Sequence, residues 1–342
     1  MALAMTAAVE GDRRGRARLV LFLLVLLVIL VALVSLAVGP AGVDASDVAG
    51  LIRDMIAGRL SAETTLEHVI LFDIRMPRTA LGLIVGGALA VAGAMMQGLF
   101  RNPLADPGLV GVSSGAAFGA IGIGALPVAA FVGGLLSTIA LYLVATRRGR
   151  TSVATMLLAG IALGALTAAA TAYLVFRSDD FQLREFTFWS MGGLGGATWP
   201  KIAIALPLVG GVFLGLPFIA RGLDALVLGE AEARHLGIYV EGLKRVIILL
   251  VSLAVGASVA FAGVIGFVGI VVPHLLRLTI GPEHRTLLPA TALLGGALLV
   301  AADMLCRVLV APAELPIGIL TAVIGAPFFL WILLRKRGLI DL

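Results

Sequence analysis

The run LVLFLLVLLVILVALVSLAV, residues 19–38, decides the fold class because its 20 residues include no charged side chain. An α-helix rises about 1.5 Å per residue, so a run of this length spans the ~30 Å hydrocarbon core of a bilayer. The apolar part of a secretory signal peptide is shorter, about 7–15 residues, and ends in a small-residue cleavage site. We therefore predict a retained first membrane helix, preceded by a basic segment that holds Arg13, Arg14, Arg16 and Arg18.

Ten apolar runs in all predict an all-α polytopic membrane protein that forms one domain over residues 1–342. The composition agrees, because 60% of the residues are hydrophobic and only 13% are charged, whereas soluble proteins are about 25% charged. The third and eighth runs are short or continue into a neighbour, which is typical of tilted or broken helices inside a bundle. After residues 19–38 the runs lie at 79–99, 108–126, 127–146, 152–176, 200–220, 244–263, 264–280, 287–307 and 317–334.

The basic residues indicate the orientation of these spans. An even number of spans places both termini on one side of the membrane. If that side is the cytoplasm, 17 of the 25 Lys and Arg residues lie inside, in agreement with the positive-inside rule. The rule explains the net charge of +5 without a nucleic-acid partner. The sequence thus predicts a cytoplasmic N-terminus at 1–18, a periplasmic loop at 39–77 and a cytoplasmic segment at 221–243.

Small residues and a short repeat indicate how the spans pack. Gly86, Gly87 and Gly93 lie in the second span, and Gly160 and Gly164 form a GxxxG motif in the fifth; such residues let helix backbones approach closely. The string VGGALAVAG at 85–93 matches VGASVAFAG at 255–263 at five of nine positions. These spans cross the membrane in opposite directions, which predicts an inverted repeat of the kind that transporters use to form a pathway.

Several kinds of chemistry have no sequence signal. The chain has no GxxxxGK[ST] loop for ATP, no GxGxxG dinucleotide motif and no HExxH zinc motif. The four histidines are scattered, and one cysteine, Cys306, cannot form a cysteine-rich metal site. We therefore expect no catalytic residues, no metal and no permanently bound cofactor. Few ionisable groups lie within the spans, so an ion-coupled secondary transporter is poorly supported. A membrane scaffold remains an alternative.

The cytoplasmic segment RGLDALVLGEAEARHLGIYVEGLKR, residues 221–245, is polar but has apolar residues at helical spacing. Gly229 and Gly237 are each typical of the residue that ends a helix. The segment therefore predicts two short amphipathic helices. They form either a docking surface for a soluble partner or an interfacial pair that lies on the lipid, and the pattern does not decide between these two interpretations.

Two groups of residues on the predicted outer side have a structural and a functional interpretation. Arg75, Arg78 and Arg307 form either a cationic rim for an acidic partner or ordinary anchors to lipid headgroups, and Arg307 has an i,i+4 ion-pair partner in Asp303. The segment RSDDFQLREFTFWSMGGLGGATW, residues 177–199, combines a basic residue with aromatic ones. It forms either an interfacial belt or the opening for a bulky, flat, anionic substrate.

Five strings together resemble the permease subunits of ABC importers for iron chelates, haem and cobalamin. They are IRMPRTALGLIVGGALAVAGAMMQGLFRNPLADPGLVGVSSGAA (74–117), LLAGIALGAL (157–166), LVLGEAEARHLGI (226–238), FAGVIGFVGIVVPHLLRL (261–278) and ELPIGILTAVIGAPFFLWILL (314–334). The resemblance implies ten helices in a subunit of the bacterial inner membrane and a homodimer with its pathway on the two-fold axis. It also implies two ATP-binding subunits inside, which hold the ATP, and a periplasmic binding protein outside.

The resemblance also implies roles for individual residues. It implies that Arg75, Arg78 and Arg307 bind the periplasmic binding protein. It also implies that a set of residues in the cytoplasmic segment contacts the ATP-binding subunits and couples them to the permease. These are Leu223, Ala225, Leu228, Gly229, Glu230, Ala231, Arg234, Leu236 and Gly237. An inner gate is expected at Asn102, Ser152, Val153 and Ala154. Where the cobalamin permease has a small polar pair, this chain has Val153 and Ala154, which favours an apolar constriction.

The substrate is implied by the string SDDFQLREFTFWSMGGLGGATW, residues 178–199, which is more similar to haem permeases than to cobalamin permeases. Arg184 is then a candidate for a charge-assisted contact with a haem propionate, and Phe188 and Trp189 are candidates for the pathway. Haem is the expected substrate, with ferric siderophores and cobalamin as alternatives.

Overall fold

The computed structural model describes residues 2–39, 45–57, 65–110, 112–122 and 126–337. Within the described residues a helix lies in each of the ten apolar runs, so the prediction of an all-α membrane protein with about ten helices is confirmed. Parts of the predicted loop at 39–77 and of the third run at 108–126 lie outside the described residues. The ten helices are α1 (Ala2–Ala37), α4 (Met76–Phe100), α5 (Val112–Gly122), α6 (Leu126–Ala145), α7 (Val153–Arg177), α9 (Trp199–Leu228), α11 (Val240–Ala262), α12 (Val268–Ile280), α13 (His284–Leu309) and α14 (Ile317–Arg337).

Length and composition separate these helices into two groups. Within the described residues, seven helices are long and apolar enough to cross a membrane, while α12 and α14 are shorter apolar helices. The helix in the third run, α5, has only 11 residues. The two runs predicted to be short therefore contain the short helices α5 and α12.

Smaller elements join the long helices. They are α2 (Ala45–Ile56), α3 (Leu66–His68), a π-helix (Val69–Arg75), a 3-10 helix (Pro107–Val110), the strands β1 (Thr146–Arg147) and β2 (Arg150–Thr151), α8 (Asp180–Ser190) and α10 (Glu230–His235). The described part of the predicted loop at 39–77 is largely helical. The helix of the second span also begins earlier than predicted, because α3, the π-helix and α4 form one continuous helix over Leu66–Phe100.

The change from π-helix to α-helix coincides with Pro77. In a π-helix the carbonyl of Phe72 would accept from the N–H of residue 77, but proline has no N–H to donate. The indole Nε1 of Trp199 donates to this carbonyl instead, at 2.8 Å. The start of α9 is thereby fixed to the start of α4.

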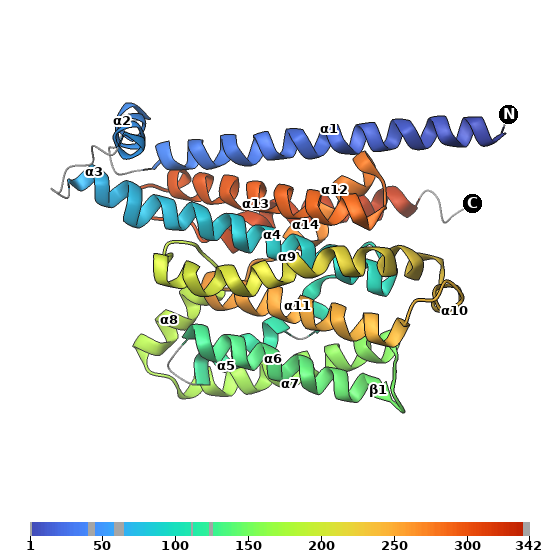
Figure 1. Cartoon of the computed structure of the whole chain (residues 1–342). Helices are drawn as coiled ribbons and strands as arrows, with labels where there is room; N and C mark the ends of the chain where they lie inside the picture. The colour runs from blue at the N-terminus through green and yellow to red at the C-terminus, as the bar shows by residue number, and fades with distance from the viewer. Residues whose placement is uncertain (1, 40–44, 58–64, 111, 123–125, 338–342) are drawn as a thin grey trace.

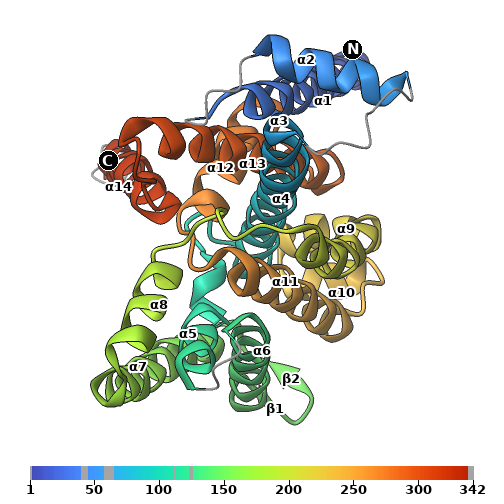
Figure 2. The same cartoon turned by 90° about the vertical axis from the view of Figure 1, so that its left-hand side faces the viewer.

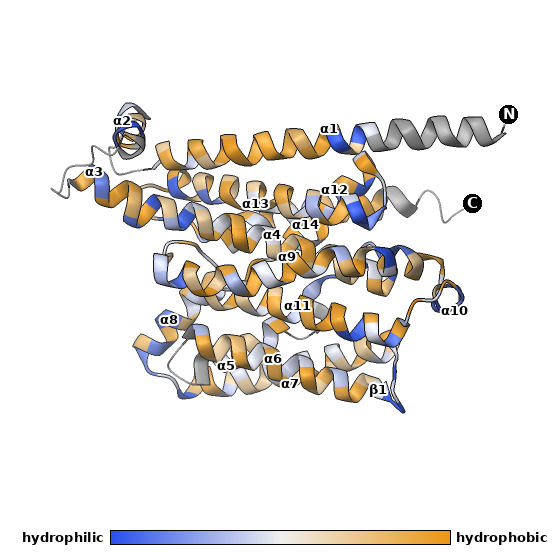
Figure 3. Cartoon of the chain, in the orientation of Figure 1, coloured by the Kyte–Doolittle hydropathy of each residue, from blue (hydrophilic) through white to orange (hydrophobic). Residues whose placement is uncertain are grey.

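The long helices run side by side between two ends of the molecule (Figure 1). One end, called the α10 end, carries α10, the β1–β2 hairpin, the start of α1 and the end of α14; the other, called the α8 end, carries α2, α3 and α8 (Figure 1). The start of α1 and the end of α14 therefore share one end of the bundle, as an even number of spans requires. Polar residues gather at the two ends and apolar residues between them (Figure 3).

The central helix is α4. In the most apolar 18-residue stretch of the helix that contains α4, 83% of the residues are buried. The corresponding share is 11% for α1 and for α7. The predicted role of glycine in packing is confirmed here, because a Cβ atom on Gly86 would overlap the carbonyl of Gly295 and one on Gly93 would overlap that of Gly269. Gly164 of the GxxxG motif differs, since its Cβ would meet nothing nearer than Ser114 Oγ at 3.9 Å.

The contacts between helices repeat in two halves. In one half α4 packs on α13 and on α12, and in the other α11 packs on α6 and on α5. The pairs α5–α6, α5–α7 and α6–α7 likewise correspond to α12–α13, α12–α14 and α13–α14. The helices α4 and α11 run in opposite directions (Figure 1). This arrangement supports the inverted repeat predicted from residues 85–93 and 255–263.

Candidate functional site

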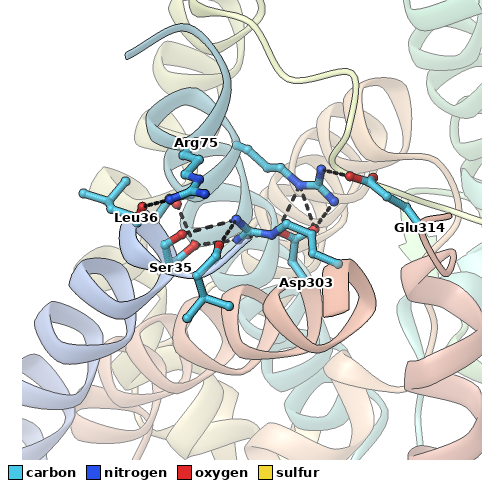
Figure 4. A network of polar contacts seen from close by, with 9 residues as sticks. Ser35, Leu36, Arg75, Asp303 and Glu314 are labelled. Carbon is cyan, nitrogen blue, oxygen red and sulfur yellow. Dashed lines mark hydrogen bonds and ion pairs between the residues drawn. The ribbon is translucent and has the colours of Figure 1, made fainter. Parts of the chain in front are cut away.

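A network of buried polar groups joins α1, α4 and α13 at the α8 end of the bundle (Figure 4). The side chain of Arg78 donates from Nε and Nη2 to the carboxylate of Asp303 at 2.9–3.0 Å, and from Nη1 to Glu314 at 2.8 Å. Arg307 Nη2 lies 2.9 Å from Asp303 Oδ2. One carboxylate therefore holds two guanidinium groups in place.

The same network caps the C-terminal end of α1. Arg75 donates to the carbonyls of Leu36 and Ala37 at 2.7 and 3.2 Å, and Arg307 donates to the carbonyl and the hydroxyl of Ser35 at 3.2 and 2.7 Å. The last four carbonyls of a helix have no partner within the helix, and cationic side chains stabilise that end. The arginines thus fix α1 onto α4 and α13.

The structure brings Arg75, Arg78 and Arg307 together but does not leave them on an exposed rim. Each residue is at most 6% exposed. The i,i+4 ion pair of Arg307 with Asp303 is confirmed, whereas anchoring to lipid headgroups is not what these side chains do. Docking of a partner by the three arginines stays a prediction, and any such partner would compete with Asp303, Glu314 and the carbonyls of α1.

The predicted pair of coupling helices is one helix and the end of another. Residues 221–228 continue α9 without a break, and only α10 is separate. The glycine positions are as predicted: Gly229, with φ of 126°, ends α9, and Gly237, with φ of 80°, follows α10. Since the first amphipathic stretch belongs to α9, its inner face packs into the bundle.

Burial divides the predicted coupling residues into two groups. Leu223 and Ala225 are buried against the bundle at 0% and 8% exposure, so their side chains do not form an outer surface. Leu228 and Leu236 are 65% and 63% exposed. Ala231, Arg234 and Gly237 are also exposed, and Glu230 is half-buried. The available surface is therefore α10 with the two leucines that flank it.

The predicted gate residues lie at two chain turns near the α10 end. Ser152 caps α7 by accepting from the N–H of Thr155 at 3.2 Å, and Val153 and Ala154 form the first turn of α7. Asn102 follows α4 and accepts from the N–H of Leu104 at 3.0 Å. The 3-10 helix after Asn102 contacts α7, so the two parts of the predicted gate belong to neighbouring segments.

One carboxyl group in this loop was not among the predicted residues. Asp106 accepts from the N–H of Gly108 at 2.7 Å. Burial raises the pKa of the Asp106 carboxyl above its ordinary value, while the Gly108 N–H opposes that rise. The string NPLADPG, residues 102–108, has a composition typical of turns. That composition does not indicate which side chain binds the backbone of the loop.

The predicted substrate residues lie on α8, a helix with a complete capping box. Asp179 accepts from the N–H of Gln182 at 2.8 Å, and Gln182 accepts from the N–H of Asp179 at 3.4 Å. Arg184 is exposed and Phe188 is 64% exposed. Trp189 is half-buried, and its ring centroid lies 5.9 Å from that of Phe186. The side chains of Arg184 and Phe188 are therefore available to a ligand, and that of Trp189 is less so.

The end of α8 is tied to two long helices. Ile317 donates its N–H to the carbonyl of Gly192 at 3.1 Å, and Gly193 donates to that of Ala262 at 2.8 Å. These bonds connect the segment after α8 to the start of α14 and the end of α11. Viewed from the α8 end, α7, α8 and α14 lie along one side of the molecule (Figure 2).

An apolar groove of about 640 Å³ lies elsewhere, between α1, α4, α9 and α13. Its walls include Phe213, Leu288 and Leu293, with His284 and Arg285 as the polar lining residues. Of the helices that line it, α1 and α9 lie on the opposite side of α4 from α7 and α8 (Figure 2). The groove therefore belongs to the surface around α1 and not to the predicted substrate residues.

Comparison with known protein families matches residues 24–335 to the FecCD transport family. The chain belongs to this family. The hemin transport system permease protein HmuU of Yersinia pestis is 49% identical over 292 residues, which cover 81% of this chain and 86% of that protein. The cobalamin import system permease protein BtuC of Halobacterium salinarum is 47% identical over 278 residues, covering 79% and 74% of the two chains.

Solved structures agree with this membership. A metal-chelate type ABC transporter in an inward-facing conformation has a TM-score of 0.80 and 32% identity, covering 92% of this chain and 99% of that chain. PsaBC from Streptococcus pneumoniae, with a TM-score of 0.55 and 14% identity, shares the fold. The resemblance to importer permeases is confirmed.

Membership in the FecCD family decides the class of function. The chain is the permease subunit of an ABC importer and works with separate ATP-binding subunits, which hydrolyse the ATP, and with a substrate-binding protein. It is a multi-pass membrane protein and not itself an ATPase. The ion-coupled secondary transporter and the membrane scaffold are thereby excluded.

Proposed function

We propose that two copies of this chain form the pathway that moves haem from a periplasmic binding protein to the cytoplasm across a bacterial inner membrane. Both termini are then cytoplasmic, and the α10 end faces the ATP-binding subunits. The observation that carries the choice of haem is the exposed pair Arg184 and Phe188 on α8.

The pair matches the chemistry of haem. Residues four apart lie on the same face of a helix, so the guanidinium of Arg184 and the ring of Phe188 face the same space. Within the described part of the chain, Arg184 has no ion-pair partner, and its charge is free for a carboxylate. A haem molecule offers two propionates for charge-assisted hydrogen bonds and a flat ring system for an aromatic face.

The relatives are compatible with this substrate and with one alternative. Permeases named for hemin and for cobalamin are 49% and 47% identical to this chain. Cobalamin is bulkier and carries no propionates, so it makes less use of a free guanidinium beside an aromatic ring. Haem therefore fits the pair on α8 better, and cobalamin and ferric siderophores are the competing outcomes of the test.

A second copy of the chain is supported by the surface of α7. Large aliphatic and aromatic side chains such as Leu23, Leu26 and Leu30 cover the exposed face of α1, which suits lipid tails. The exposed residues of α7 include many alanines, which let another helix approach closely. These are Ala162, Ala165, Ala168, Ala169 and Ala172. We place the two-fold axis on the side of α7, α8 and α14.

The proposed mechanism is alternating access. The loaded binding protein docks at the α8 end and the ATP-binding subunits dock on α10. Binding and hydrolysis of ATP move α10, and the two copies then open the path to the cytoplasm at Asn102 and Ser152–Ala154.

Uptake into proteoliposomes tests the choice of haem. The chain is reconstituted with its cognate ATP-binding subunit and binding protein, and ATP-driven uptake of haem, a ferric siderophore and cobalamin is compared. We expect uptake of haem, and a loss of about tenfold in Arg184→Ala, because a charge-assisted hydrogen bond contributes about 1.5–3 kcal/mol. Arg177→Ala, which removes an exposed charge at the end of α7, is the matched control. Uptake of cobalamin or a siderophore in place of haem would overturn the proposal.

A further inference from the structure

A buried lysine connects α10 to the start of α7. Lys244, on the first turns of α11, has a side chain that is only 3% exposed. Its Nζ lies 2.8 Å from Glu230 Oε1 on α10 and 3.4 Å from Glu241 Oε1 on α11. It also donates to the carbonyl of Thr151, on β2, at 2.8 Å. An ammonium group has three N–H donors, and here each has an acceptor on a different element.

Glu241 completes the connection to the hairpin. Its Oε2 accepts from the N–H of Thr151 at 2.9 Å, so both main-chain groups of Thr151 are bound by side chains of α11. Arg234 of α10 lies 3.5 Å from Glu241 and 3.6 Å from Glu230. We call Glu230, Arg234, Glu241, Lys244 and Thr151 the Lys244 cluster.

The cluster ends one residue before the predicted gate. Thr151 is 4% exposed and is held in the hairpin by its hydroxyl, which lies 3.0 Å from that of Thr146. Ser152 follows as the N-cap, and α7 begins at Val153. A displacement of Thr151 therefore displaces the first turn of α7 directly, because no flexible segment lies between them.

The burial of Lys244 favours movement of its three partners together, since its side chain is only 3% exposed. Removing one partner from a buried ion pair leaves an uncompensated charge in a low-dielectric site, which is strongly unfavourable. A shift of α10 that left Lys244 behind would break its bond to Glu230, and a shift of Lys244 that left Thr151 behind would break the bond to its carbonyl. A movement of α10 that kept these bonds would therefore also shift Thr151.

We propose that Lys244 is a positioning residue that carries the movement of α10 to the start of α7, so that work done by the ATP-binding subunits reaches the residues Ser152–Ala154. The inference rests on the proposed function for α10 as the ATPase docking helix and for Ser152–Ala154 as the gate. It adds the side chain that joins them.

The first test measures substrate uptake per ATP hydrolysed in the reconstituted importer. Lys244→Met keeps the length of the side chain and removes the ammonium group. Arg245→Met, which removes the exposed charge of the next residue on α11, is the matched control. We expect Lys244→Met to hydrolyse ATP while uptake per ATP falls at least about fivefold, the lower bound of typical coupling between sites. An unchanged ratio would overturn the proposal.

The second test follows the gate itself. Ser152→Cys introduces an exposed thiol, while the native Cys306 is fully buried and stays unlabelled. We expect ATP to change the rate at which a maleimide labels Ser152→Cys, and we expect this change to be lost with Lys244→Met. A merely structural role for Lys244 would leave the ATP-dependent change in place in every complex that assembles, and that result would overturn the proposal.

Three further cases are distinguishable. If Lys244→Met does not assemble, Glu230→Ala is used, because it removes the acceptor on α10 and leaves Lys244 bound to Glu241 and Thr151; an unchanged uptake ratio and labelling change in Glu230→Ala would then overturn the inference. If the unmodified chain does not assemble with any ATP-binding subunit, the proposed function of α10 fails. If the unmodified chain transports and both variants transport with the same yield, only the inference about Lys244 fails.

Discussion

The carboxylate of Asp303 on α13 holds the guanidinium of Arg78 on α4, with two bonds to Nε at 3.0 Å and one to Nη2 at 2.9 Å. The two residues are 225 positions apart in the chain. Their pairing joins the central helix α4 to α13 and, through Arg307, to the end of α1 (Figure 4). Buried polar contacts thus join α1, α4 and α13 to one another at the α8 end.

Removing the charge of Asp303 should destabilise the bundle. In Asp303→Asn both arginines lose their buried counter-ion, and losing one partner of a buried pair costs about 3–5 kcal/mol. Glu314→Gln removes the other acid bound to Arg78, but Glu314 is 46% exposed, and such a pair contributes about 1 kcal/mol or less. Thermal unfolding in lipid nanodiscs should show a clearly lower midpoint for Asp303→Asn only. Equal midpoints would contradict the role assigned to Asp303.

Adding one methyl group to Gly93 should disrupt the packing of α4 on α12. Its Cβ would overlap the carbonyl of Gly269, which is backbone and cannot move without moving α12. Overpacking of this kind costs about 1–3 kcal/mol or more. Gly210→Ala is the matched control, because nothing lies within 4 Å of its Cβ and alanine favours a helix by about 1 kcal/mol. We expect a lower midpoint of thermal unfolding for Gly93→Ala and an unchanged or higher one for Gly210→Ala. A Gly93→Ala protein as stable as the parent would contradict the close approach.

The spans could be predicted because their signals are local. The length of each apolar run and the small residues within it fix where a helix crosses and where it packs closely. The same holds for Gly229 and Gly237, whose positive φ values require glycine. The start of α10 was harder, because residues 221–228 have helical spacing whether they begin a new helix or extend α9. Residues 221–228 contain no proline, and Gly222 does not interrupt the helix, so α9 continues to Leu228.

The polar networks could not be predicted because their partners are distant. The i,i+4 pair of Asp303 with Arg307 is visible in the sequence, but the pairing of Asp303 with Arg78 depends on how α4 packs on α13. The burial of these arginines has the same origin, since the end of α1 covers them. In the sequence, Lys244 cannot be distinguished from the other basic residues of the predicted cytoplasmic side. Its partners become visible only in the fold, where α10 and β2 pack against α11.

A bulky residue on the exposed face of α7 should separate the two copies. Ala165 is exposed in the single chain, and a tryptophan there would prevent another helix from approaching. Leu26→Trp on α1 is the control, because an exposed, lipid-facing residue tolerates a large apolar side chain. The mass of the particles in nanodiscs should correspond to one copy for Ala165→Trp and to two copies for Leu26→Trp. A dimer of Ala165→Trp would place the two-fold axis away from α7.

Glu314 offers a direct test of whether Arg78 receives the binding protein. Arg78 is bound by Glu314 within the chain, so an acidic group of a docking partner has to replace Glu314. In Glu314→Gln the side chain at position 314 is neutral, so an acidic group of the binding protein displaces it from the guanidinium of Arg78 more readily. We expect the affinity for the binding protein to rise by up to about fivefold, which corresponds to the ~1 kcal/mol of a partly exposed ion pair.

Long-range repulsion must be separated from this exchange. Glu185→Gln removes an equal charge from an exposed position on α8, at the same end of the bundle, but Glu185 does not contact Arg78. Both variants lower the repulsion of an acidic partner, whereas only Glu314→Gln frees a guanidinium nitrogen. Titration of the binding protein onto the permease at two salt concentrations should show a gain for Glu314→Gln that exceeds the gain for Glu185→Gln and persists at high salt, because contact pairs are screened less than distant charges. Equal gains in the two variants would show that Arg78 keeps its intrachain partners and does not dock the binding protein.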